Sequence, residues 1–279
     1  RPDRPAAGQS GVKALFRAAG AAVFVALLGA ASAQAAFVVT AERLDLDAER
    51  GWLRAWQVRI TDDGRVLTAA ELVLDRAAGA GTLSGGVRAL GPEGELRSRA
   101  ARIRFTRALQ LLQVDAEGGS RLHARGWTLS ADRVQLDTRS GVAVATGRPA
   151  VLTGREVTAA APRVLYRSRE QQAGLAAPAR FETPQGTLEG QESTFRLREQ
   201  TARVAGPVAF RFAAGQGVAR EAVADFAQGR VDLMGPVRVR WRSSVLEGQR
   251  VVVWYRQGRV VVEGPSRMRV EEEDLPRSP

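Results

Sequence analysis

The chain has 279 residues, of which 44% are hydrophobic and 25% are charged, so it is long enough to bury a sizeable core. It holds no cysteine, which excludes a disulfide framework, a zinc–thiolate site and a cysteine nucleophile. The formal net charge is +11, and almost all of the positively charged residues are arginines. Such a charge favours anionic partners: nucleic acid, lipid headgroups or acidic polymers.

Residues 1–35 have the build of a secretory signal peptide. Lys13 and Arg17 precede an apolar run, and Ala33-Gln34-Ala35 follows as a small-x-small cleavage pattern. We therefore expect a secreted chain that begins at Ala36. An uncleaved membrane anchor stays open as the alternative, because the apolar stretch approaches the length of a membrane-spanning helix.

Internal repetition fills residues 36–270, where about eight units of 29 or 30 residues follow one another. A step with proline beside glycine or alanine marks the later units, at 147–149, 177–179, 206–208, 235–237 and 264–266. Self-similarity at this period is typical of a repeat architecture.

Side chains within each unit alternate between apolar and polar, which predicts half-buried strands. In residues 237–242, for example, Val237, Val239 and Trp241 alternate with three arginines. Turn residues such as Asp62-Asp63-Gly64 and Gln257-Gly258 separate the runs. We predict an all-β fold, a repeat-built antiparallel β-jellyroll or β-taco of about sixteen short strands. Residues 271–279 are expected to form a disordered acidic tail.

The paired phrases of the repeat resemble the OstA-like family, the LptA–LptC group of periplasmic lipopolysaccharide-transport proteins. The likeness rests on Ala131-Asp132-Arg133-Val134, Ala145-Thr146-Gly147 and Arg203-Val204-Ala205-Gly206-Pro207-Val208. It is best over Leu129–Phe210 and looser over Phe37–Val270. The apparent cleavage site favours the family's bridge protein over its anchored partner.

This resemblance implies a periplasmic carrier that shelters the acyl chains of lipopolysaccharide, or a similar anionic glycolipid, during transport to the outer membrane. The free edges of the strand array imply β-augmentation, edge to edge, with another copy or with inner- and outer-membrane transport components.

Two sets of candidate site residues follow. Inward apolar side chains would line the lipid groove: Val134, Leu136, Val151, Val164, Tyr166, Phe181, Phe195, Leu197, Val208, Phe210, Phe212, Val237, Val239 and Trp241. Arginines, which bind phosphate bidentately, would contact the headgroup: Arg238, Arg240 and Arg242. In a protein that binds no lipid, the first set is an ordinary core. The second set is then a solvated face or a guard against edge pairing.

The sequence carries no recognisable enzymatic apparatus, and we expect no cofactor and no metal site. The single histidine, His123, stands alone beside a turn, and Asp45 and Asp47 share a strand face without a third ligand. A two-carboxylate glycosidase needs no local motif and stays open. Nucleic-acid binding is disfavoured, because aromatic residues are not interleaved with the basic ones. The main alternative is a secreted structural β-repeat scaffold with a filled interior and no lipid binding.

Overall fold

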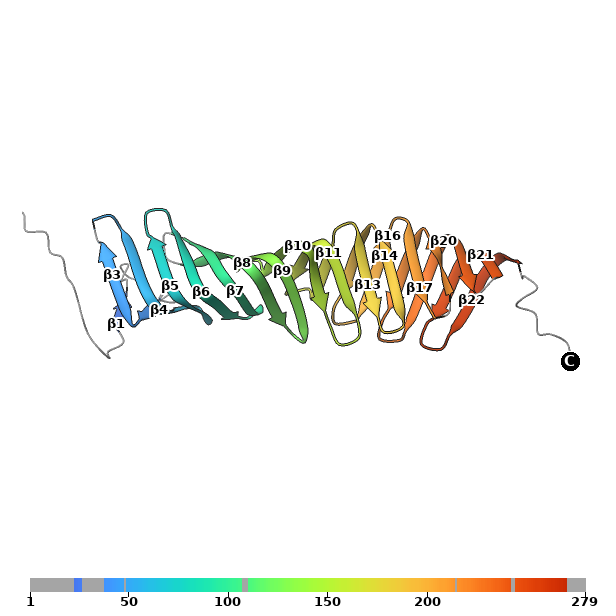
Figure 1. The fold of residues 1–279 in the computed structure, drawn as a ribbon, viewed down its shortest axis with the longest axis horizontal. Helices are drawn as coiled ribbons and strands as arrows, with labels where there is room; N and C mark the ends of the chain where they lie inside the picture. Colours follow the sequence, from blue (N-terminus) through green and yellow to red (C-terminus); the bar gives the residue numbers. More distant parts are fainter. Residues whose placement is uncertain are drawn as a thin grey trace, which may run out of the picture.

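The computed structural model describes residues 23–26, 38–47, 49–106, 110–213, 215–241 and 244–269, which form strands and turns and no helix. They build one elongated molecule in which strands follow one another along the long axis (Figure 1). Of the predicted signal peptide, only residues 23–26 are described, and the predicted acidic tail lies outside the described residues. Within the described ranges, no helix is long and apolar enough to cross a membrane.

All strands pair antiparallel in a single sheet. The long strands are β4 (Trp52–Asp62), β5 (Arg65–Asp75), β6 (Ala80–Gly91), β7 (Gly94–Phe105), β8 (Leu111–Ala124), β9 (Trp127–Asp137), β10 (Val142–Thr153), β11 (Thr158–Arg167), β20 (Arg230–Trp241), β21 (Ser244–Trp254) and β22 (Arg259–Arg269). The short strands are β1 (Val23–Ala26), β2 (Val38–Ala41), β3 (Arg43–Asp47), β12 (Gln172–Leu175), β13 (Ala179–Thr183), β14 (Gly186–Gly190), β15 (Glu192–Arg196), β16 (Thr201–Ala205), β17 (Val208–Phe212), β18 (Gly215–Ala219) and β19 (Glu221–Asp225).

Ten of the short strands lie end to end in twos, so that each two together occupy the place of one long strand. For example, β12 and β13 both pair with β11, at its two ends, and β18 and β19 both pair with β20. The other strands that lie end to end in this way are β2 and β3, β14 and β15, and β16 and β17. Counted this way, the described sheet has sixteen bent strands besides β1, close to the predicted number. The predicted all-β antiparallel fold is confirmed.

Each strand line bends at its middle, and the Gly-Pro steps of the repeat lie at these bends rather than at the turns between strands. The register of the β20–β21 pair shifts between Met234 and Val237, and the backbone of Gly235 has a φ of +88°. Gly206 has a φ of +83° at the equivalent place between β16 and β17. Glycine suits this conformation, and proline suits a position where the ladder is interrupted.

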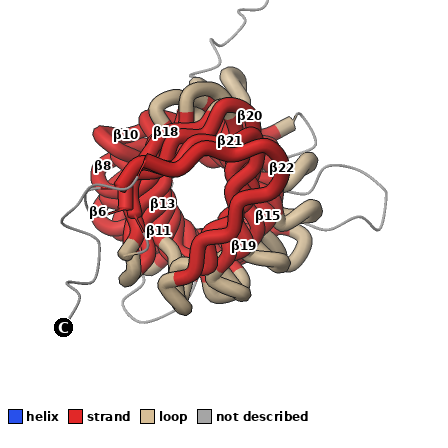
Figure 2. The backbone as a smooth tube through the Cα atoms, turned by 90° about the vertical axis from the view of Figure 1, so that its right-hand side faces the viewer, coloured by secondary structure: helices blue, strands red, loops and turns tan. Residues whose placement is uncertain are grey.

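The bends divide the sheet into two arms. We call residues 43–47, 49–56, 71–84, 100–106, 110–117, 133–146, 163–175, 192–205, 221–234 and 250–263 arm A. Arm B consists of residues 38–41, 58–69, 87–98, 120–131, 150–161, 179–190, 208–213, 215–219, 237–241, 244–248 and 266–269. Seen along the long axis, the two arms curve round a common centre (Figure 2). Because side chains alternate across a strand, every second residue of each arm points to that centre and forms one continuous apolar core.

The bend in β6 offers a test, because it contains two adjacent glycines with different surroundings. Both Gly85 and Gly86 have positive φ, at +77° and +89°. A Cβ on Gly85 would lie 2.5 Å from the Cβ of Ala70, whereas one on Gly86 would meet nothing within 4 Å. We expect Gly86→Ala to lower the free energy of unfolding by about 1 kcal/mol through backbone strain alone. Gly85→Ala should cost about 2 kcal/mol more, because the clash adds to the strain. Urea titration of both variants checks this, and equal losses would contradict the geometry of the bend.

Candidate lipid-binding interior and its seam

The structure places twelve of the predicted groove residues in the interior between the arms. Each is buried, with at most 6% of the residue exposed. They come from both arms and from strands β9 to β20: Val134, Leu136, Val164, Tyr166, Phe181, Phe195, Leu197, Val208, Phe210, Phe212, Val237 and Val239. That these side chains contact a lipid remains a prediction.

Two predicted lining residues lie elsewhere. Val151 points outward, because the bend at 147–149 changes the alternation and puts Ala150 and Leu152 inside. Its prediction as an inward residue is wrong. Trp241 is the last residue of β20, at the tip of arm B, and is 44% exposed.

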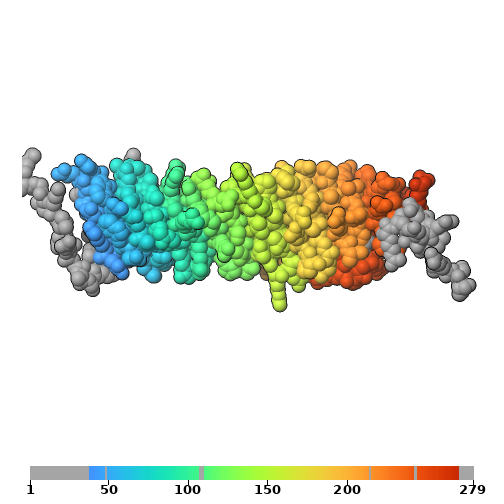
Figure 3. All heavy atoms as spheres, viewed as in Figure 1, coloured from blue at the N-terminus to red at the C-terminus, as the bar shows by residue number. Residues whose placement is uncertain are grey.

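The interior is filled by its own side chains. Two hollows along the interior have volumes of about 20 Å³ and about 10 Å³, room for about one water molecule each. The larger lies between arm B residues Leu67, Leu96 and Leu122 and arm A residues Leu111 and Leu136. On the face shown in Figure 3 the surface is that of a continuous rod. An acyl chain therefore has to displace these contacts in order to enter.

The turns at the ends of the two arms face each other along one side of the molecule, which we call the seam. On the arm A side the turns include 137–141 and 225–229, and on the arm B side they include 62–65, 91–94 and 153–158. Among the described residues no strand pairing joins the two rows of turns. The seam is held by side chains, whereas the rest of the sheet is held by main-chain hydrogen bonds.

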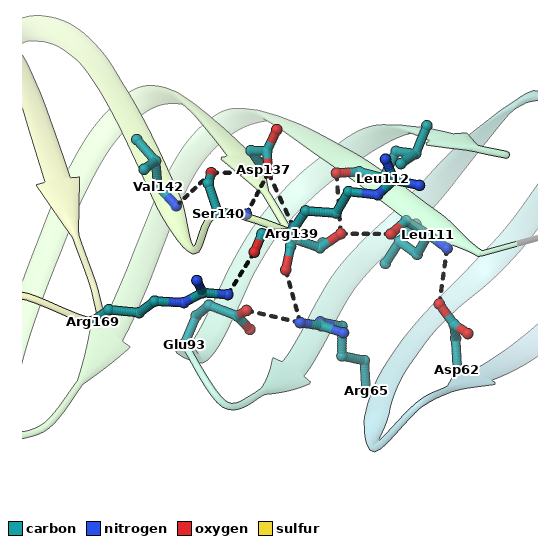
Figure 4. A network of polar contacts seen from close by, with 11 residues as sticks. Asp62, Arg65, Glu93, Leu111, Leu112, Asp137, Arg139, Ser140, Val142 and Arg169 are labelled. Atoms are coloured by element: carbon teal, nitrogen blue, oxygen red, sulfur yellow. Dashed lines mark hydrogen bonds and ion pairs between the residues drawn. The ribbon is translucent and has the colours of Figure 1, made fainter. Parts of the chain in front are cut away.

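Polar contacts close the seam near the N-terminal end (Figure 4). The carboxylate of Asp62, on arm B, accepts a 2.8 Å hydrogen bond from the main-chain N–H of Leu111, on arm A. Arg65 donates from Nη2 to the carbonyl oxygen of Thr138, at 2.9 Å, and to Oε1 of Glu93, at the same distance. Asp62 and Glu93 are buried, so these bonds are shielded from water.

A second polar contact closes the seam further along. Arg256 pairs with Glu156, a residue one hundred positions earlier in the chain. The same guanidinium donates to the carbonyl oxygens of Phe226 and Ala227, at 2.8 and 2.9 Å. Arg256 thus ties two turns of arm A together and connects them to arm B.

Aromatic rings fill the interior behind the seam in the C-terminal half. Trp127 packs edge-on against Phe195, with ring centroids 5.1 Å apart, and Phe181 stacks on Phe226 at 5.6 Å. Phe212 stacks on Tyr255 at 4.9 Å. Each of these pairs joins arm B to arm A or its turns. Burial raises the pKa of the Tyr255 hydroxyl, which donates to the carbonyl oxygen of Phe226.

Two of the predicted headgroup arginines lie on the outer face of arm B. Arg238 and Arg240 are exposed, and Arg238 lies 3.6 Å from Glu247. Arg242 lies outside the described residues. A binding role for these arginines remains a prediction.

His123, the single histidine, makes one short polar contact. His123 is exposed, and its Nδ1 lies 3.1 Å from the hydroxyl of Thr128. In the described part of the chain, no three metal-ligating side chains come together.

Comparisons with known proteins give matches among solved structures only. No family model and no curated protein matches the chain. A similar solved structure is that of LptH from Pseudomonas aeruginosa, described as the LptA-homologous periplasmic component of the lipopolysaccharide transport device. It is 17% identical, and the match covers 52% of this chain and 94% of that chain with a TM-score of 0.25. A likeness of this size carries no argument about family or function, so membership of the OstA-like family stays a prediction.

The Arg65–Glu93 pair should contribute measurably to stability. Only 17% of the Arg65 side chain and 8% of the Glu93 side chain are exposed, so losing the carboxylate leaves a poorly hydrated guanidinium. We expect Glu93→Gln to lower the free energy of unfolding by about 2 kcal/mol. The matched control is Glu182→Gln, which breaks an exposed pair with Arg180 and should cost less than about 0.5 kcal/mol. Similar losses in urea titrations of the two variants would contradict a buried ion pair beside the seam.

Proposed function

We propose that this chain is a non-enzymatic periplasmic lipid carrier. Its cargo is lipopolysaccharide or a similar anionic glycolipid, whose acyl chains lie between the two arms while the headgroup stays in water. The interior that receives the acyl chains is the core described above, and the seam is the path by which they enter.

The observation that supports this proposal best is the contrast between the sheet, which is held by main-chain hydrogen bonds, and the seam, which is held by side chains. The interior is apolar along every strand line from β4 to β21, so it offers an acyl chain a continuous path. The seam beside that path has side-chain contacts and no described strand pairing. Separating the arms therefore breaks few bonds and leaves the hydrogen-bonded sheet intact.

Acyl chains can replace the contacts that the arms make with each other. Opening the seam exposes apolar surface, which is unfavourable in water at roughly 25 cal/mol per Å². A bound acyl chain covers the same surface, so the open form is stabilised by the ligand. The filled interior is then the resting form, and occupancy by lipid shifts the population toward the open one.

The ends of the sheet support edge-to-edge assembly. In the described residues β22 pairs only with β21, so its other edge has main-chain groups available for a further strand. At the other end β1 pairs with β2, and cleavage after Ala35 removes β1 and frees that edge. We propose that these edges pair with another copy or with inner- and outer-membrane transport components.

The filled interior also favours a second candidate, a secreted structural scaffold that binds no lipid. Hollows of about 20 Å³ and less are ordinary for a packed core. Such a scaffold would use its free edges for assembly. It differs from the carrier by one property, since its interior never opens to a ligand.

Lipid binding separates the two candidates. Native mass spectrometry of the mature chain, purified from its own envelope, should reveal a bound species with the mass of an acylated, phosphorylated glycolipid. Phe210→Glu places a charge in the interior, where 4% of the residue is exposed, and should reduce that species at least tenfold. Val218→Glu, on the outer face of the adjoining strand and 53% exposed, should leave it unchanged. A chain that stays free of lipid after incubation with lipid A would favour the scaffold.

A covalent lock on the seam tests the route of loading. The chain has no cysteine of its own, so Asp62→Cys together with Leu111→Cys introduces a single possible disulfide across the seam. Once mass analysis has established its formation, the oxidised variant should load lipid A several-fold more slowly than the reduced one. Equal loading rates would mean that acyl chains do not pass this part of the seam.

A further inference from the structure

The outer surfaces of the two arms differ in charge. The outward strand residues of arm A include twelve arginines and twelve acidic residues, so that face is neutral. Many of them are paired, for example Arg54 with Glu71 and Arg250 with Glu263, both at 2.6 Å. The outward strand residues of arm B include ten arginines and four glutamates. The excess positive charge of the sheet therefore lies on one face.

Three of the ten arginines form an uninterrupted row on that face. Arg88 on β6 lies directly opposite Arg97 on β7, which lies directly opposite Arg121 on β8. These are the only arginine-to-arginine partners in the described strand pairings. Neighbouring strands are about 4.8 Å apart, so the row presents three guanidinium groups within roughly 10 Å. Like charges placed directly opposite each other are unfavourable in a sheet.

The charge of this row is incompletely balanced. Glu95 accepts hydrogen bonds from Nε of Arg88, at 2.6 Å, and from Nε of Arg97, at 2.5 Å. Both bonds fall on one carboxylate oxygen, and Arg97 and Arg88 hold the pKa of Glu95 below its ordinary value. No acidic residue of the described chain forms an ion pair with Arg121. Among the described residues, one carboxylate thus pairs with two of the three arginines, and the third has no anionic partner.

Arginines elsewhere on arm B follow a different pattern. Arg238 and Arg267 lie on either side of Glu247, and Arg180 lies opposite Glu189. Arg211 and Arg240 are separated by Gln216 on the strand between them. In the strand pairings that the structure describes, arginines lie directly opposite each other only at the row on β6, β7 and β8.

The strands that carry the row also line the larger interior hollow. Ala89, Leu96 and Leu122 are the neighbours of the three arginines in sequence and point to the opposite side, where they border the 20 Å³ space. The adjoining turn carries Glu93, which pairs with Arg65, and Arg65 crosses the seam at the same place by donating to the carbonyl oxygen of Thr138. A cationic outer row and an apolar inner hollow therefore lie back to back beside one section of the seam.

We propose that Arg88, Arg97 and Arg121 form a binding site for phosphomonoester groups. The site rests on the proposed carrier function, because its ligand is the phosphorylated headgroup of a lipid whose acyl chains occupy the interior behind it. The headgroup passes round the arm B edge of the seam and lies on the outer face. A phosphate carries enough charge and acceptor oxygens to engage two guanidinium groups, and it supplies the anion that the row lacks.

The test measures the binding of lipid A with and without its phosphates by the full mature chain. Arg97→Gln and Arg121→Gln should each weaken binding of diphosphoryl lipid A about tenfold and leave binding of the dephosphorylated lipid unchanged. Glu95→Gln should have the opposite effect and tighten binding of the phosphorylated lipid, since it removes the competing carboxylate. The matched control is Arg54→Gln on arm A, for which we expect no change with either lipid.

The outcomes of this experiment distinguish the possible failures. If both lipids bind and the arginine variants bind them as the wild type does, the row is not the headgroup site, while the carrier function stands. If neither lipid binds the wild type, the carrier function fails, and the headgroup site fails with it. Inorganic pyrophosphate is the third probe. If it binds in an Arg97-dependent manner while the phosphates of lipid A add nothing to affinity, the row serves a soluble phosphorylated compound and the headgroup assignment is overturned.

Discussion

The two sides of this molecule are held by different kinds of bond. Main-chain hydrogen bonds run from strand to strand along the whole sheet, through both arms, and resist separation of the strands. Between the arms the contacts are apolar packing and a small number of polar side-chain bonds, such as those of Arg65 and Arg256. Every proposal about the interior depends on this difference, because it leaves one side of the molecule without main-chain hydrogen bonds between its strands in the described residues.

The bends determine where that side lies. Each strand line turns at its middle, so its two ends come to the same side of the molecule and meet as two rows of turns. From residue 147 onward the glycines and prolines at the bends recur at 29 or 30 residues, so these bends align along the molecule and the seam runs alongside them. A straight strand would leave the inner face of the sheet in water.

Much of this arrangement was predictable from the sequence, because alternation and repeat length are local properties. The error at Val151 has an equally local cause. In three successive units the residue directly after proline is buried: Ala150, Ala179 and Val208. The step at 147–149 has an extra residue between glycine and proline, so counting from the glycine gives the wrong face. Counting from Pro149 gives the right one.

The contacts across the seam were not predictable in this way. Arg65 meets Thr138 and Glu156 meets Arg256 because the sheet curves, and the partners are separated by 73 and 100 residues. No periodic pattern identifies such pairs. The row of arginines is an intermediate case, since strand pairing alone brings Arg88, Arg97 and Arg121 together. Identifying the row required the strand register seen in the structure, because the unit from 96 to 127 departs from the regular spacing.

The repeat also makes the length of the molecule adjustable independently of its cross-section. Each unit adds two strands, or roughly 10 Å, and makes its hydrogen bonds only with the units on either side. Duplicating or deleting a unit therefore changes the span while leaving the bend, the arms and the interior the same. In a protein built in this manner, the number of units sets the distance that the molecule can span.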